Sequence, residues 1–124
     1  VQRIDHGVRC LEDAALVQRL VAERMPLTVC PLSNVKLCVF KTLADHNLPA
    51  LLDAGLCATI NSDDPAYFGG YLLQNYAETF DALPQLGVQQ AYALARNSLE
   101  ASFAPASDKA RWVAALDETF ARLG

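Results

Sequence analysis

Three short strand-like segments predict β-strands. They cover residues 3–6, 27–30 and 56–60, and they are followed by Gly7, Pro31 and Asn61. The second and third runs are nearly continuous in hydrophobicity, which is typical of parallel strands covered on both faces. We therefore expect a parallel sheet.

Helical periodicity fills the segments between and after these strands. Leu16, Leu20 and the pair Val17 and Val21 recur at helical spacing, which predicts a helix over residues 11–24. Shorter and later helices are predicted over residues 49–53 (ended by Gly55), 71–83, 88–103 and 107–123 (capped by Ser107). Residues 35–40 are expected to be irregular.

The alternation of strands and helices indicates an α/β fold. The predicted strands end at His6, Cys30 and Asn61, so the two repeating units are 24 and 31 residues long. A complete (β/α)8 barrel takes about 250 residues, or roughly 31 per unit. We therefore expect about three βα units plus trailing helices from the C-terminal part of a TIM-type barrel, with no second domain in residues 1–124. A small open parallel sheet is the alternative.

The composition disfavours several classes of protein. Of the 124 residues, 52% are hydrophobic, as in a globular domain, and the net charge of −4 gives no attraction to nucleic acid or an anionic membrane. No apolar stretch reaches the length of a membrane span. The four cysteines form no C-x-x-C pair, so we expect buried free thiols and a cytoplasmic location.

Polar side chains cluster at the carboxyl end of each predicted strand. His6 follows the first strand, Ser33 and Asn34 follow the second, and Asp63 and Asp64 follow the third. In a parallel barrel these strand ends share one face, and that face carries the active site. We therefore expect three segments that are remote in sequence to converge.

Each of these motifs also has an ordinary structural explanation. A histidine before a glycine, as at His6, is often a hydrogen-bonded turn residue. Asp64 followed by Pro65 is a common helix start, with the aspartate as its cap. However, the adjacent carboxylates of Asp63 and Asp64 repel each other unless a cation or a proton is present. That repulsion favours a metal ion at this strand end.

Other polar positions are expected to be structural. Ser33 and Asn34 are expected to satisfy backbone groups of a loop. His46 lies between Asp45 and Asn47 in a polar stretch. We expect its side chain at the surface.

Taken together, the motifs resemble the adenosine and adenine deaminase family. The resemblance rests on VQRIDHGVR at residues 1–9, PLTVCPLSN at 26–34 and NSDDPAYFGGY at 61–71, in matching order and spacing. Asn75-Tyr76, Arg96-Asn97-Ser98 and Ser102-Phe103 are similar to the family's late helices. The second and third motifs look closest to the adenine deaminase branch.

The resemblance implies a zinc hydrolase on a (β/α)8 barrel, with one Zn²⁺ ion and a small purine as substrate. It implies that Asp63 ligates zinc, that Asp64 binds a ring nitrogen of the purine, and that His6 orients and helps to deprotonate the attacking water. The expected reaction is hydrolytic deamination of adenine to hypoxanthine and ammonia, by attack of a zinc-activated water at C6 of the ring.

The chain also departs from the family pattern. The family uses a His-x-His pair and a His-Ala-Gly-Glu segment, whereas this sequence has two histidines and neither motif. We therefore expect an inactive, poorly folding C-terminal portion that requires a missing N-terminal barrel half. The alternatives are part of an adenosine deaminase, a different metal hydrolase of the same fold, or a non-catalytic half-barrel module that binds a partner.

Overall fold

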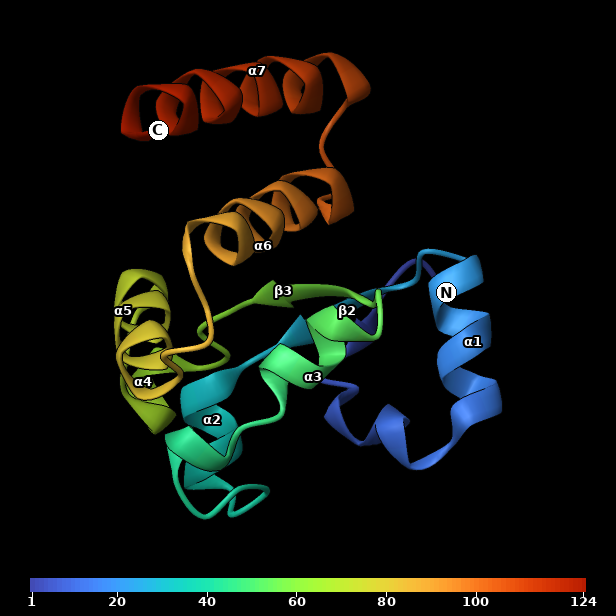
Figure 1. Cartoon of the computed structure of the whole chain (residues 1–124), viewed down its shortest axis with the longest axis vertical. Helices are drawn as coiled ribbons and strands as arrows, with labels where there is room; N and C mark the ends of the chain where they lie inside the picture. The colour runs from blue at the N-terminus through green and yellow to red at the C-terminus, as the bar shows by residue number, and fades with distance from the viewer.

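Three parallel strands form the centre of the protein, in the order β1-β2-β3. The computed structural model describes residues 1–124. Strands and helices alternate along the chain (Figure 1). Their bounds are β1 (Ile4–Asp5), η1 (Val8–Glu12), α1 (Ala14–Ala22), β2 (Pro26–Val29), α2 (Pro31–Lys36), η2 (Leu43–Asp45), α3 (Leu48–Asp53), β3 (Cys57–Ile60), α4 (Pro65–Phe68), α5 (Leu72–Ala82), α6 (Val88–Ala101) and α7 (Ala106–Leu123), where η denotes a 3-10 helix.

The register of the sheet aligns its apolar side chains. Leu27 of β2 lies opposite Ile4 of β1 and Ala58 of β3, and Val29 pairs with Ile60. Leu27, Val29, Ala58 and Ile60 belong to one buried cluster, against which Ile4 packs. Leucines from α1, α3 and α6 complete this cluster. The helices are therefore fixed to the sheet by apolar burial, the main favourable contribution to folding.

The hydrogen-bond ladder continues beyond the ends of the strands. The backbone N–H of His6 donates to the Thr28 carbonyl at 3.0 Å, and that of Asn61 donates to the Val29 carbonyl at 2.8 Å. The first residue after β1 and the first after β3 are thus held to β2. The polar segments that follow β1 and β3 therefore begin at residues that are hydrogen-bonded to the sheet.

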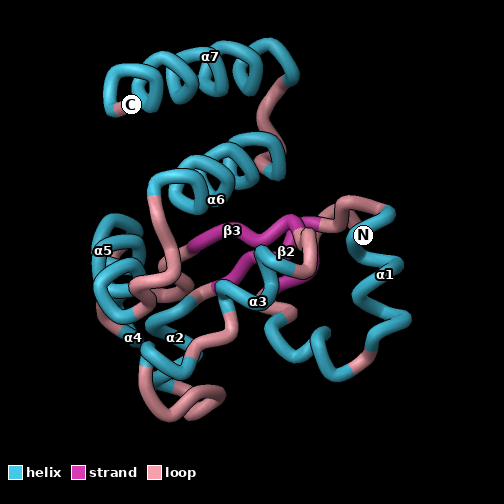
Figure 2. The backbone as a smooth tube through the Cα atoms, viewed as in Figure 1, coloured by secondary structure: helices cyan, strands magenta, loops and turns pink.

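The C-terminal helices form two further layers beside the sheet. Figures 1 and 2 show α6 next to β3, with α7 on the far side of α6. α7 contains no buried residue, and its Trp112 side chain is 38% exposed. None of the helices combines the length and apolar character that a membrane crossing requires.

Two predicted helix boundaries were wrong. The helix expected over residues 11–24 is divided at Asp13, whose carboxylate accepts hydrogen bonds from two amides of the first turn of α1. A side-chain oxygen that satisfies these amides starts a new helix there. Ser107 does not cap the last helix, because α7 begins one residue earlier, at Ala106 after Pro105.

The segment after β2 is more regular than expected. Pro31 starts the short helix α2, since proline is well suited to the first helical turn. Ser33 and Asn34 therefore lie in a helix and are buried, rather than serving an exposed loop. The irregular segment expected over residues 35–40 begins only after the end of α2. Gly55 has a φ of 83° just after α3, as predicted for a C-terminal glycine.

Candidate active site

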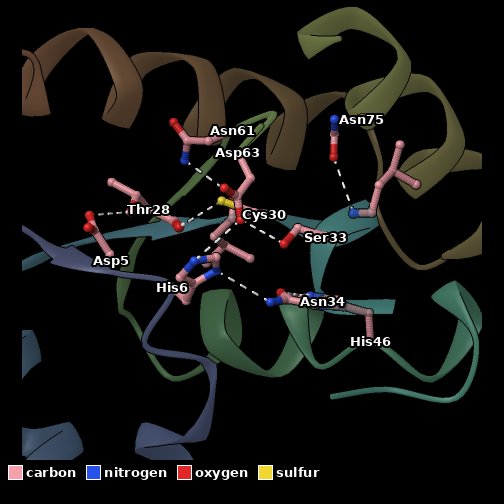
Figure 3. A network of polar contacts seen from close by, with 12 residues as sticks. Asp5, His6, Thr28, Cys30, Ser33, Asn34, His46, Asn61, Asp63 and Asn75 are labelled. Carbon is pink, nitrogen blue, oxygen red and sulfur yellow. Dashed lines mark hydrogen bonds and ion pairs between the residues drawn. The ribbon is translucent and has the colours of Figure 1, made fainter. Parts of the chain in front are cut away.

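The polar residues that follow the three strands lie close together (Figure 3). His6 comes directly after β1, Ser33 and Asn34 come from α2 after β2, and Asp63 comes from the loop after β3. The carboxyl ends of adjacent parallel strands lie at one edge of a sheet, which brings these segments together despite their separation in sequence.

Asp63 is the centre of this cluster. The Ser33 hydroxyl donates a hydrogen bond to Oδ2 of Asp63 at 2.7 Å, and Nε2 of His6 lies 3.6 Å from the same oxygen. Both His6 and Asp63 have left-handed backbones, with φ of 58° and 55°. Such angles are uncommon for residues with a side chain and cluster at functional sites.

A polar cavity of about 440 Å³ opens beside His6 and Asp63. This volume falls within the usual range for small-molecule sites. Thr28 and Asp5 form part of its wall and are joined by a hydrogen bond of 3.0 Å from the threonine hydroxyl to the carboxylate. The remaining lining residues are Cys30, Asn61, Ser62 and Leu72. The alternation along β2 explains this wall, since Leu27 and Val29 are directed to the core and Thr28 to the cavity.

The side chains of His6, Cys30 and Asp63 have the chemistry of a metal site. One potential ligand atom from each residue lies within 4.8 Å of the others. Burial, reinforced by the negative charge of Asp63, raises the pKa of the Cys30 thiol to about 12. A protonated thiol is a poor metal ligand. The Asp63 carboxylate is able to bind a metal ion, because Ser33 occupies Oδ2 and Oδ1 has no protein partner.

Asp64 is directed towards the following helix. Its Oδ1 accepts hydrogen bonds from the amides of Ala66 at 3.1 Å and Tyr67 at 3.2 Å, and Pro65 occupies the first turn of α4. The expectation that Asp64 caps a helix is therefore confirmed. Its Oδ2 takes no part in the cap.

Comparison with known proteins identifies the family. The sequence model described as Adenosine deaminase matches residues 1–119, nearly the whole chain. The chain belongs to the adenosine deaminase family. The resemblance carried by the three motifs is thereby confirmed.

Curated relatives within the adenosine deaminase family include several adenine deaminases. That of Geotalea uraniireducens (strain Rf4) is 66% identical over 119 residues, covering 96% of this chain and 34% of the relative. That of Hahella chejuensis (strain KCTC 2396) is 60% identical over 118 residues, covering 95% of this chain and 35% of the relative. The chain thus spans about a third of the length of the curated relatives it matches.

Solved structures agree with the barrel fold. Adenine deaminase from Arthrobacter aurescens superimposes with a TM-score of 0.88 at 51% identity, covering 95% of this chain and 36% of that protein. An amidohydrolase from Burkholderia ambifaria, with bound Zn, gives a TM-score of 0.84 at 21% identity, covering 99% of this chain and 34% of that protein; at this identity the likeness concerns the fold alone. The three parallel strands and their helices are therefore part of a (β/α)8 barrel.

One residue of this family member was misjudged from its sequence. His46 was expected at the surface, but its side chain is buried and only 3% exposed. Its Nε2 lies 2.9 Å from Oδ1 of Asn34, and its Nδ1 accepts a hydrogen bond of 3.0 Å from the Leu48 amide. Burial lowers the pKa of His46 to about 4. The site therefore has a buried, neutral histidine behind it.

Asn34 connects this histidine to the cavity. Its Nδ2 lies 3.4 Å from Nδ1 of His6, while its Oδ1 faces His46. The position of Asn34 after a strand was predictable from the sequence, but neither of these contacts was. His46 is distant from the recognised motifs, and its neighbours Asp45 and Asn47 are polar, so local sequence carried no signal of its burial.

Proposed function

We propose that this chain is part of an enzyme that hydrolytically deaminates adenine to hypoxanthine and ammonia. The observation that carries the proposal is the 66% identity to proteins named adenine deaminase, over 96% of the chain. The meeting of His6 and Asp63 beside a cavity supports a catalytic site rather than a binding relic. The predicted cytoplasmic location, the absence of nucleic-acid and membrane partners, and the assignment of residues 1–124 to one barrel domain stay predictions.

Asp63 is the residue of this chain that would hold a zinc ion. Zinc accepts aspartate oxygen as a ligand, and when bound it supplies Lewis acidity that makes water nucleophilic near neutral pH. The hydrogen bond from Ser33 fixes the rotation of the Asp63 carboxylate and so aims Oδ1. Residues that hydrogen-bond to a metal ligand, without touching the metal themselves, commonly orient the ligand in this way.

His6 and Asp64 act on the water and on the purine. The Nε2 atom of His6 faces the same space as Asp63 and would hold the attacking water in line with the ring. Asp64 has Oδ2 free of its helix cap, so this oxygen would accept a hydrogen bond from a protonated ring nitrogen. An ionised carboxylate is an acceptor only, so it selects a nitrogen that carries hydrogen.

With His6 assigned to the water and the Cys30 thiol protonated, the remaining ligands would come from residues outside this chain. A catalytic zinc site uses about three protein ligands. Of the two histidines here, His46 has both ring nitrogens occupied by hydrogen bonds and cannot serve. We therefore propose that the other zinc ligands, and a glutamate that protonates the ring, lie in the part of the enzyme that precedes these residues.

The proposal is tested by ammonia release from adenine and from adenosine, with the full-length enzyme that contains this chain. We expect turnover of adenine in clear preference to adenosine. Asp63→Asn should lower kcat/KM by more than about 100-fold, since it alters a ligand rather than a residue behind one. Asp53→Asn, at an exposed position of α3, is the matched control. Preference for adenosine, or activity unaffected by Asp63→Asn, would overturn the proposal.

A further inference from the structure

A chain of hydrogen bonds extends from the backbone of α3 to the cavity. It passes from Leu48 through His46 and Asn34 to His6, and Figure 3 shows its last three side chains in sequence. The side chains of His46 and Asn34 are buried, at 3% and 2% exposed.

The Leu48 amide fixes the direction of the first two bonds. A backbone N–H is always a donor, so Nδ1 of His46 must accept and carries no proton. The neutral imidazole then has its hydrogen on Nε2, which donates to Oδ1 of Asn34 at 2.9 Å. A charged His46 would place a second hydrogen against the Leu48 amide. The burial that lowers the pKa of His46 to about 4 keeps the ring neutral.

The same reasoning assigns donor and acceptor in the hydrogen bond between Asn34 and His6. Because Oδ1 of Asn34 accepts from His46, the atom of Asn34 that faces His6 is the amide nitrogen, which can only donate. Nδ1 of His6, at 3.4 Å, is therefore the acceptor. The proton of a neutral His6 is left on Nε2, the nitrogen 3.6 Å from Asp63.

We propose that Leu48, His46 and Asn34 act as a positioning relay that holds His6 as its Nε2–H tautomer, so that His6 donates a hydrogen bond to the attacking water. This inference rests on the proposed deaminase function. His6 then orients the water and stabilises negative charge on its oxygen, but does not help to deprotonate it, in contrast to what the family resemblance implied. The proton that the water loses passes to another base, a carboxylate supplied outside this chain.

The decisive variant is Asn34→Asp in the full-length enzyme. A carboxylate is nearly isosteric with the amide and still accepts from His46, but it presents an acceptor to Nδ1 of His6. His6 should then carry a hydrogen on Nδ1, in either the Nδ1–H tautomer or the doubly protonated ring. In histidine-selective ¹⁵N spectra we expect the neutral Nε2–H pattern of His6 to be lost. We also expect kcat to fall by about 10–100-fold with KM little changed.

A second pair of variants separates positioning from packing. His46→Gln retains a donor and an acceptor and should keep most of kcat. His46→Phe retains the ring that packs on Phe40, with centroids 4.5 Å apart, but loses both hydrogen bonds and should lower kcat. A purely packing role predicts the opposite order.

Asn47→Asp is the matched control. Asn47 donates to the Val8 carbonyl at 2.7 Å, so the same chemical change removes one hydrogen bond without touching His6. This variant should lower stability but leave the His6 spectrum unchanged. The proposal is overturned if wild-type His6 gives the Nδ1–H pattern, or if Asn34→Asp changes neither the spectrum nor kcat more than Asn47→Asp. The spectra need no substrate, so failure to deaminate adenine would refute the function and leave the relay testable.

Discussion

Replacing Ser33 by alanine tests how the site holds Asp63, the proposed metal ligand. The Ser33 hydroxyl is fully buried and donates to Oδ2 of Asp63 at 2.7 Å. Ser33→Ala removes this bond, while alanine is well tolerated in α2. The nearest remaining partner of Oδ2 is Nε2 of His6, at 3.6 Å. The Asp63 carboxylate should then be free to rotate.

The magnitude follows from what the hydrogen bond does. Because the Ser33 hydroxyl orders the Asp63 carboxylate and is not itself a proposed metal ligand, its loss weakens zinc binding only through the reordering of one side chain. That cost is about 0.5–1.5 kcal/mol, or roughly two- to tenfold in affinity. The folded protein should lose more, about 1.5–3 kcal/mol, because the bond is to a charged group.

The assay is zinc competition against a chromophoric chelator, with unfolding midpoints measured in parallel on the full-length enzyme. Ser98→Ala is the matched control, because its hydroxyl donates to the Leu94 carbonyl within α6, away from Asp63. Zinc affinity that is unchanged by Ser33→Ala would refute the reasoning. So would an equal loss of affinity in Ser98→Ala.

Two further predictions concern stability, measured by urea unfolding of the same enzyme. Gly70→Ala should destabilise by about 1–3 kcal/mol more than Gly87→Ala, because Gly70 has a positive φ and its added Cβ would collide with the Leu32 side chain, whereas Gly87 has a negative φ and its added Cβ meets no such collision. Equal losses would contradict this. The pKa of His46 is lowered from 6.5 to about 4, so only the unfolded chain binds its proton between these values. This difference contributes roughly 3 kcal/mol to the free energy of unfolding, and the contribution should be lost as the pH falls from 6.5 to 4. The prediction is excluded if the stability of wild type and that of His46→Phe depend on pH in the same way.

The fold could be predicted from sequence where local pattern and tertiary structure agree. The apolar runs of β2 and β3 are buried in the sheet, and the three strands have the parallel order that their spacing indicated. Boundaries were missed where one side chain ends or starts a helix. Asp13 starts α1, and Pro31 starts α2 in a segment expected to be a loop.

Only the residues of the candidate site that line the cavity were predictable from the sequence. His6 and Asp63 lie at strand ends, where barrel geometry places functional residues, so position alone nominated them. The burial of His46 was missed because its polar neighbours form local hydrogen bonds that the sequence does not reveal. Asp45 caps a turn with Thr42, and Asn47 binds a backbone carbonyl. These contacts allow the ring between them to turn inward, so polarity of neighbours is a poor guide to burial.

His6 and Asp63 have left-handed backbones, with φ of 58° and 55°. This conformation lowers the stability of the folded protein at the two positions whose side chains are proposed to act in the reaction. A residue with a side chain is disfavoured there by roughly 1–2 kcal/mol, whereas glycine adopts this conformation readily. Glycine at either position would relieve the strain and would also delete the imidazole or the carboxylate. Stability and chemistry therefore favour different residues at these two positions. In a library of variants selected only for thermal stability, we expect His6 and Asp63 to be replaced by glycine before any residue of the core changes.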